Sequence, residues 1–170
     1  MIGLKNDTVQ IVPYDSEWKN LFEIEKDKIS KIFGNSIIGI EHVGSTSVEG
    51  LIAKPIIDIA VGINDYNENI AGIVSGFVKN GYRDKGDQKD DGGYLIAKEE
   101  NDITTFHIHI VEYGAGLWEI YLSFRDKLRT DPKIFKEYTE LKTSLAIRYT
   151  GERVKYTKSK DQFIKSILNK

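Results

Sequence analysis

The sequence predicts an α/β (α+β) fold, with a mixed β-sheet and flanking helices in residues 1–116 and a helical subdomain in residues 117–170. Two observations predict it. In the first part, β-branched runs bounded by Gly, Pro, Asn or Asp alternate with amphipathic segments. After Tyr113–Gly116 the apolar residues recur at helical spacing. Because 170 residues is the usual size of one domain, we expect a single domain over residues 1–170.

The first half of the chain predicts two helices and two strands. A helix is expected from Trp18 to Phe33, where apolar residues recur at near-helical spacing and Gly34 follows as a C-cap. Residues 37–43 and 56–63 are predicted strands because they are rich in β-branched side chains. Asn64–Asp65 can cap a further helix, which Gly81 would close.

The second half predicts a hairpin and then helices. Residues 85–93 read as a charged loop, and residues 94–97 and 103–111 as an antiparallel pair of strands. Helices are expected over residues 117–129, 132–149 and 152–168. Asp131 followed by Pro132 is a good N-cap and first-turn pair for the second of them.

Composition excludes several classes of protein. With 40% hydrophobic and 29% charged residues the chain reads as globular. It has no cysteine, which excludes disulfides, thiolate metal sites and cysteine nucleophiles. It has no apolar run near the roughly 18 residues of a membrane span, and its first residues lack the features of a secretory signal. We therefore expect a cytoplasmic protein that does not bind membranes.

The formal net charge of −2 hides an asymmetry. Residues 1–116 hold 11 Lys and Arg against 19 Asp and Glu, a charge of −8, whereas residues 117–170 hold 13 against 7, a charge of +6. The basic part either holds an anionic ligand near an acidic, metal-binding part or forms a solvated helical surface. A pI near 6.0 argues against a dedicated duplex-DNA binder and leaves a phosphorylated small molecule open.

One segment is not explained by bulk composition. An apolar strand runs into the turn Gly44–Ser47, and the next strand carries a single carboxylate, Asp58, in its middle. Burying a lone carboxylate costs several kcal/mol unless hydrogen bonds or a cation compensate. The compensation for Asp58 is either a set of backbone N–H groups from the turn or a metal site.

The chain has three histidines. Since side chains alternate faces along a strand, His107 and His109 share a face, and Asp58 lies on a single face with Ala60. If the two strands are neighbours, these three side chains line one concave surface as a metal or general-base cluster; otherwise the histidines are hydrogen-bonded structural residues. For His42 the structural role is favoured, with one ring nitrogen holding the turn.

A phosphate site is the second hypothesis. The turn offers hydroxyl and N–H groups at a helix start, although an ordinary N-cap explains it equally well. Arg125 and Arg129, four residues apart on a predicted helix, can fork onto phosphate oxygens, whereas the alternative for each is a solvated surface. The candidate phosphate or nucleotide ligands are Gly44, Ser45, Thr46, Ser47, Lys54, Arg125, Arg129 and Lys160, with Lys142, Arg148, Arg153 and Tyr156 as weaker candidates.

Two segments, Glu41–Ser47 and Lys54–Val61, resemble the GrpB family and, through it, the nucleotidyltransferase superfamily with the polymerase-β-like fold. The resemblance covers roughly residues 9–168 and includes Phe106–Glu112 and Phe124–Arg129. It implies that the Gly44–Ser45 turn holds nucleotide phosphates and that Asp58, separated from Ser45 by twelve residues, binds divalent metal. The superfamily pattern has a second carboxylate two residues later, where this chain has Ala60.

The function that this resemblance implies is binding of a nucleotide or phosphorylated small molecule with a divalent metal, and transfer of a nucleotidyl group. The alternatives are a non-catalytic regulatory module, which can have a protein partner, and a metal-dependent hydrolase. The candidate catalytic and metal-binding residues are Asp58, His107 and His109. Because imidazole is a poor ligand for Mg²⁺, this set suits Mn²⁺ or Zn²⁺ better.

Overall fold

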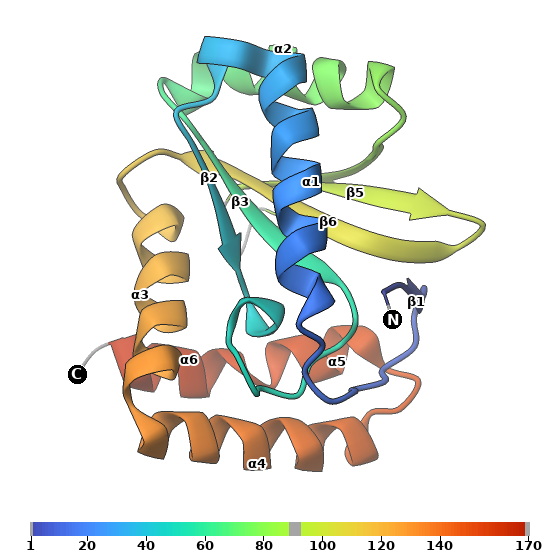
Figure 1. Ribbon diagram of the computed structural model, residues 1–170, viewed down its shortest axis with the longest axis vertical. Helices are drawn as coiled ribbons and strands as arrows, with labels where there is room; N and C mark the ends of the chain where they lie inside the picture. The colour runs from blue at the N-terminus through green and yellow to red at the C-terminus, as the bar shows by residue number, and fades with distance from the viewer. Residues whose placement is uncertain (1, 89–92, 169–170) are drawn as a thin grey trace.

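The computed structural model describes residues 2–88 and 93–168, and its centre is a mixed β-sheet (Figure 1). Among the described residues the sheet has six strands, in the order β2–β3–β6–β5–β4, with the short β1 paired to the start of β6. β3 and β6 run parallel and the other pairs are antiparallel. The strands are β1 (Leu4–Lys5), β2 (Gly39–Val43), β3 (Ile57–Ile63), β4 (Arg83–Asp87), β5 (Tyr94–Glu100) and β6 (Ile103–Glu112).

Helices cover both faces and one end of this sheet (Figure 1). On one face α1 (Glu17–Phe33) and α2 (Tyr66–Lys79) bury the main core, and on the other α3 (Leu117–Thr130) packs against β2, β3 and β6. The remaining helices lie across one end: α4 (Pro132–Arg148), α5 (Arg153–Lys158) and α6 (Asp161–Leu168). Two single 3₁₀ turns complete the chain, η1 (Gly34–Ser36) and η2 (Ser45–Ser47). The predicted fold class is confirmed.

The main core follows from strand alternation. Ile57, Ile59 and Val61 of β3 point to the α1–α2 face and are fully buried there, as are Ile108 and Ile110 of β6. Every second residue therefore points to the opposite face, which carries Asp58 and the two strand histidines. Within residues 2–88 and 93–168, none of the helices combines the length and apolar character of a membrane span.

Three predicted segments differ from the structure. Part of the predicted loop 85–93 belongs to β4, an edge strand whose residues are charged because only β5 pairs with it; residues 89–92 lie outside the described residues. The predicted helix 152–168 is two helices, separated by Ser159 and Lys160. The side chain of Asp65 makes no capping bond, and Glu112 accepts the N–H of Tyr66 in its place.

The other predicted caps behave as expected. Asp131 accepts hydrogen bonds from the N–H groups of Lys133 and Ile134, with Pro132 in the first turn of α4. Gly34 follows α1 with a φ of 53°, in the left-handed region that glycine adopts without strain.

A buried carboxylate ties α1 to the sheet. Glu25 is 1% exposed, and it accepts hydrogen bonds from the hydroxyl of Tyr82 at 2.6 Å and from the ammonium of Lys98 at 2.7 and 2.9 Å. These groups come from α1, the approach to β4, and β5. The charge is therefore satisfied by a bidentate ion pair and a neutral donor.

His42 fixes the turn that follows β2. Its ring stacks on Phe22 with centroids 4.8 Å apart, and Nε2 lies 3.0 Å from the hydroxyl oxygen of Thr46. The prediction that one ring nitrogen holds the turn is confirmed. Burial lowers the pKa of His42 to about 4; the charge of Asp58 opposes this, and Arg129 and Arg125 add smaller contributions in the same direction as burial.

We predict that Glu25→Ala lowers the free energy of unfolding by about 2–3 kcal/mol, because the Tyr82 hydroxyl is left buried without its partner. The loss is moderate since Lys98 is 38% exposed and can be hydrated. Urea denaturation measures it. Glu23→Ala, on the exposed side of the same helix, should change stability by less than about 0.5 kcal/mol. Equal losses in the two variants would contradict the assignment.

We predict an acid-sensitive contribution from His42. Since the pKa is about 4 in the folded protein and 6.5 in the unfolded chain, the unfolded chain alone binds a proton between these values. Stability should therefore fall by about 3 kcal/mol as the pH drops from 6.5 to 4, and this contribution should be flat above 6.5. Urea midpoints of the wild type and His42→Gln across this range test it; identical pH slopes would refute it.

Candidate functional site

The two strand histidines converge on Asp58, as the sequence predicts. Parallel pairing of β3 with β6 sets Asp58 opposite His107 and Ala60 opposite His109. Nδ1 of His107 lies 3.3 Å and Nε2 of His109 lies 3.2 Å from Oδ1 of Asp58. The side chains are 31%, 19% and 23% exposed for Asp58, His107 and His109, so the cluster is reachable from solvent.

The proton of His107 can be placed from its partners. Nη2 of Arg153 lies 3.0 Å from Nε2 of His107, and an arginine has donors only, so Nε2 is the acceptor. The ring is then neutral, and its Nδ1–H donates to Asp58. Burial also favours the neutral ring, because it lowers the pKa of His107; His109 and Arg153 lower it further, and Asp58 opposes them.

The carboxyl group of Asp58 remains deprotonated and negatively charged in this cluster. Burial raises its pKa, but hydrogen bonds from His107 and His109 outweigh burial and hold the pKa well below 3.8. Among the described residues its hydrogen-bond partners are these two histidines. The alternative in which backbone N–H groups of the Gly44–Ser47 turn satisfy Asp58 is therefore wrong.

The cluster has the composition of a metal site. One carboxylate oxygen and two imidazole nitrogens lie within 4.8 Å of one another. The outer ring nitrogens of both histidines have partners: Nδ1 of His109 lies 3.4 Å from the hydroxyl of Tyr121, and Nε2 of His107 faces the Arg153 donor. Metal-binding histidines usually donate from their outer nitrogen, so the Arg153 contact would have to change if His107 ligates metal. Two imidazoles and a carboxylate fit Zn²⁺ or Mn²⁺ better than Mg²⁺.

The position of the missing second carboxylate is closed by packing. Ala60 is fully buried in a cluster with Val43, Val111 and Trp118. Trp118 belongs to α3, which lies over this part of the sheet. A longer polar side chain at position 60 would enter this apolar contact, so the donor set is limited to Asp58 and the histidines.

Position 44 must be glycine because the carboxylate of Asp58 packs against it. Its φ is 67°, and a Cβ at this position would lie 2.6 Å from Oδ2 of Asp58. Two hydroxyls of the turn are engaged with protein atoms: Ser47 donates to the carbonyl of Gly44 at 2.6 Å, and the hydroxyl of Thr46 bonds His42 at 3.0 Å. The close approach of turn and carboxylate thus accounts for this glycine without a ligand.

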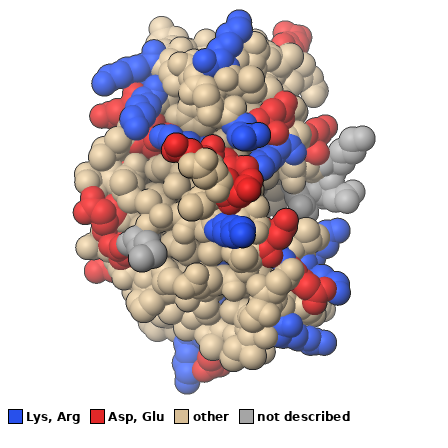
Figure 2. All heavy atoms as spheres, turned by 90° about the vertical axis from the view of Figure 1, so that its right-hand side faces the viewer, with Lys and Arg blue, Asp and Glu red and all other residues tan. Residues whose placement is uncertain are grey.

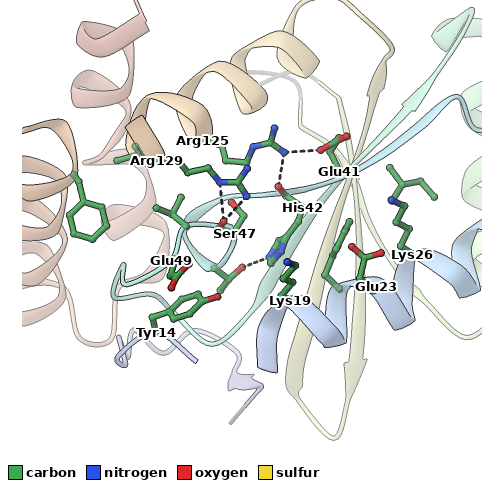
Figure 3. A pocket seen from close by; sticks show the side chains of 16 residues that line it. Tyr14, Lys19, Glu23, Lys26, Glu41, His42, Ser47, Glu49, Arg125 and Arg129 are labelled. Atoms are coloured by element: carbon green, nitrogen blue, oxygen red, sulfur yellow. Dashed lines mark hydrogen bonds and ion pairs between the residues drawn. The ribbon is translucent and has the colours of Figure 1, made fainter. Parts of the chain in front are cut away.

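Arg125 and Arg129 do not join the Asp58 cluster. Arg125 donates to Glu41 at 2.7 Å and to the carbonyl of His42 at 3.1 Å, while Arg129 donates to the carbonyl of Ser47 at 2.7 Å. Figure 3 shows both in a separate hollow of about 630 Å³ between α1 and α3, which Asp58 and the strand histidines do not line. These two candidate phosphate ligands therefore line a hollow that Asp58 does not line.

Four other cations lie around Asp58 on the helical side: Lys54, Lys142, Arg153 and Lys160. Burial lowers the pKa of each, to about 7 for Lys54, while the charge of Asp58 opposes this in every case. Lys54 and Lys160 were predicted phosphate ligands; Lys142 and Arg153 were weaker candidates. The spacing of apolar residues could have identified Lys142 as a stronger candidate. It follows Tyr138 by four residues and precedes Leu145 by three, so it lies on the buried stripe of α4.

The comparisons with known proteins agree with the resemblance seen in the motifs. Residues 8–170 match the family described as GrpB protein. The chain is 36% identical over 172 residues to the glutamate-rich protein GrpB of Alkalihalophilus pseudofirmus, covering 99% of each. It is 37% identical to the UPF0157 protein YqkA of Bacillus subtilis, covering 93% of this chain but only 46% of that longer protein.

A solved structure shows the same fold. The crystal structure of the conserved protein GrpB from Enterococcus faecalis superposes with a TM-score of 0.81 and 33% sequence identity, over 93% of this chain and 94% of that one. The family match, the relatives and this structure each span nearly the whole chain. The chain belongs to the GrpB family.

Proposed function

We propose that this GrpB protein binds a nucleotide or another phosphorylated small molecule together with a divalent metal ion. The observation that carries the proposal is the convergence of Asp58, His107 and His109 from two neighbouring strands. A charged carboxylate and a neutral imidazole in contact are already in the protonation states that ligate metal, apart from the single proton on Nδ1 of His107. The likeness of the Gly44–Ser45 and Asp58 motifs to nucleotidyltransferases supports a phosphorylated ligand.

A metal ion bound at these three side chains would supply charge neutralisation at phosphorus. In nucleotidyl transfer an acceptor oxygen forms a bond to the α-phosphorus, the bond to the departing pyrophosphate breaks, and a base takes the acceptor's proton. Both strand imidazoles contact Asp58, so an imidazole that ligates metal is not available as this base. Transfer then depends on the acceptor or on solvent to release the proton.

Ala60 favours a second candidate, in which binding occurs without turnover and the protein serves as a regulatory module. Phosphoryl chemistry with two metal ions needs several oxygen ligands close together, and position 60 offers none. Release of pyrophosphate from nucleoside triphosphates, with Mn²⁺ or Zn²⁺ present, separates the two: release that Asp58→Asn abolishes supports the transferase, and saturable binding without release supports the module.

We predict that wild-type protein binds Mn²⁺ or Zn²⁺ at one site and that Asp58→Asn weakens this binding at least about tenfold, because a charged ligand is lost. Isothermal titration calorimetry measures both affinities. Asp27→Asn, which removes an exposed carboxylate from α1 on the other face of the sheet, should leave them unchanged. Equal affinities for wild type and Asp58→Asn would show that the metal is bound elsewhere.

We predict that restoring the superfamily carboxylate fails in this chain. Ala60→Asp should lower the free energy of unfolding by about 3 kcal/mol or more, because a charge enters the contact with Trp118. It should increase neither metal affinity nor pyrophosphate release. A stable variant with tighter metal binding would mean that α3 leaves room for a second ligand.

A further inference from the structure

The α4–α6 end of the molecule carries a group of four cations around Asp58. Lys54 precedes β3, Lys142 lies on α4, Arg153 begins α5, and Lys160 lies between α5 and α6. Lys54, Arg153 and Lys160 each lower the pKa of at least one other member of this group, and Asp58 is the carboxylate that acts on all four. Asp7 and Glu99 also act on Arg153, and Asp161 acts on Lys160, whereas for Lys54 and Lys142 the acid is Asp58, which is already bonded to two histidines.

Two of these ammonium groups have no polar partner. Lys54 and Lys160 lie over the same ring, that of Tyr156, at 5.5 and 4.7 Å from its centroid. Neither ammonium group makes a hydrogen bond or ion pair with another residue in the described ranges. Lys160 lies one helical turn after Tyr156, at the interruption between α5 and α6.

The ring between them carries an orphan donor. Tyr156 is fully buried, and its hydroxyl is the buried side-chain polar atom that lacks a hydrogen-bond partner in the part of the chain described by the structure. Nearby, Lys142 is 2% exposed and spends one of its three donors on the carbonyl of Ile52. Half-buried ammonium groups without partners and an unpaired buried hydroxyl are costly unless something binds them.

Two other parts of the described surface do not show this imbalance. The hollow between α1 and α3 pairs Arg125 with Glu41 and Asp126 (Figure 3). On the face shown in Figure 2, acidic and basic side chains are interspersed. The cations around Tyr156 differ from these regions because they form an excess of positive charge that is half-buried and lies next to the candidate metal site.

We propose that Lys54, Lys142, Arg153, Lys160 and the hydroxyl of Tyr156 form an anion subsite that binds a phosphate group bearing two or more negative charges, such as a diphosphate. It rests on the proposed function, since it would hold the phosphate tail of that ligand beside Asp58. A diphosphate matches the site in charge, because it neutralises several cations at once, and in chemistry, because its oxygens accept from ammonium, guanidinium and hydroxyl donors. This subsite takes over the phosphate-binding role that the sequence predicts for Arg125 and Arg129.

The test is binding of inorganic pyrophosphate to the whole protein in the presence of a chelator, measured by calorimetry and by the shift in melting temperature. Lys160→Met should weaken binding about tenfold or more, because a charge-assisted contact is lost. Its ligand-free melting temperature should not fall, since an unpaired cation is removed. A structural lysine would show the opposite, with lower stability and unchanged binding.

Two further variants sharpen the result. Tyr156→Phe removes only the orphan hydroxyl, so it should weaken pyrophosphate binding about threefold to tenfold without lowering the melting temperature. Arg129→Met is the matched control, a cation of the other hollow, and should bind like the wild type. Loss of binding in Arg129→Met with retention in Lys160→Met would overturn the proposal, as would the absence of pyrophosphate binding by the wild type.

The outcomes separate this subsite from the metal proposal. If Asp58→Asn and wild type bind metal equally while Lys160→Met loses pyrophosphate, the subsite stands and the metal site fails. If metal binding depends on Asp58 but pyrophosphate binds all variants alike, the metal site stands and the subsite fails.

Discussion

The register between β3 and β6 is the constraint on which the candidate site depends. These strands are parallel neighbours, with Asp58 opposite His107 and Ala60 opposite His109. A slip of one residue would turn a strand's buried isoleucines to the polar face and its polar residues into the core. Since fully burying such a side chain is worth about 1.5–3 kcal/mol, packing against α1 and α2 fixes the register. The approach of the three polar side chains is a consequence of how the opposite face is buried.

The same constraint explains which parts of the site the sequence could predict. Strand alternation places Asp58, His107 and His109 on the correct faces, and one assumption, that the strands are neighbours, brings them together. Local signals were equally sufficient for the cap at Asp131 and for the role of His42. The arginines of α3 could not be placed in this way, because the periodicity of a helix indicates which side chains share a face but not which hollow that face borders.

The cations around Tyr156 escaped prediction for a related reason. Lys54, Lys142 and Lys160 are far apart in the sequence, and a lysine on a helix is by default a solvated surface residue. Only the packing of α4 and α5 against the end of the sheet buries them together. The break between α5 and α6, at which Lys160 lies, contains no Gly or Pro from which it could be predicted. The sequence shows that residues 117–170 are basic and residues 1–116 acidic, but it does not show where in the fold the basic side chains gather.

Arg153 connects the metal cluster with the cations. Its guanidinium donates to Nε2 of His107, which requires the ring proton to sit on Nδ1 and point at Asp58. Ligation of metal through Nδ1 would leave the proton on Nε2, facing the arginine donor, so the Arg153 contact and metal ligation by His107 exclude one another. An anion among the cations of the α4–α6 end offers Arg153 a better acceptor. On these grounds the phosphate group and the metal ion should bind with positive coupling, because each removes an obstacle to the other.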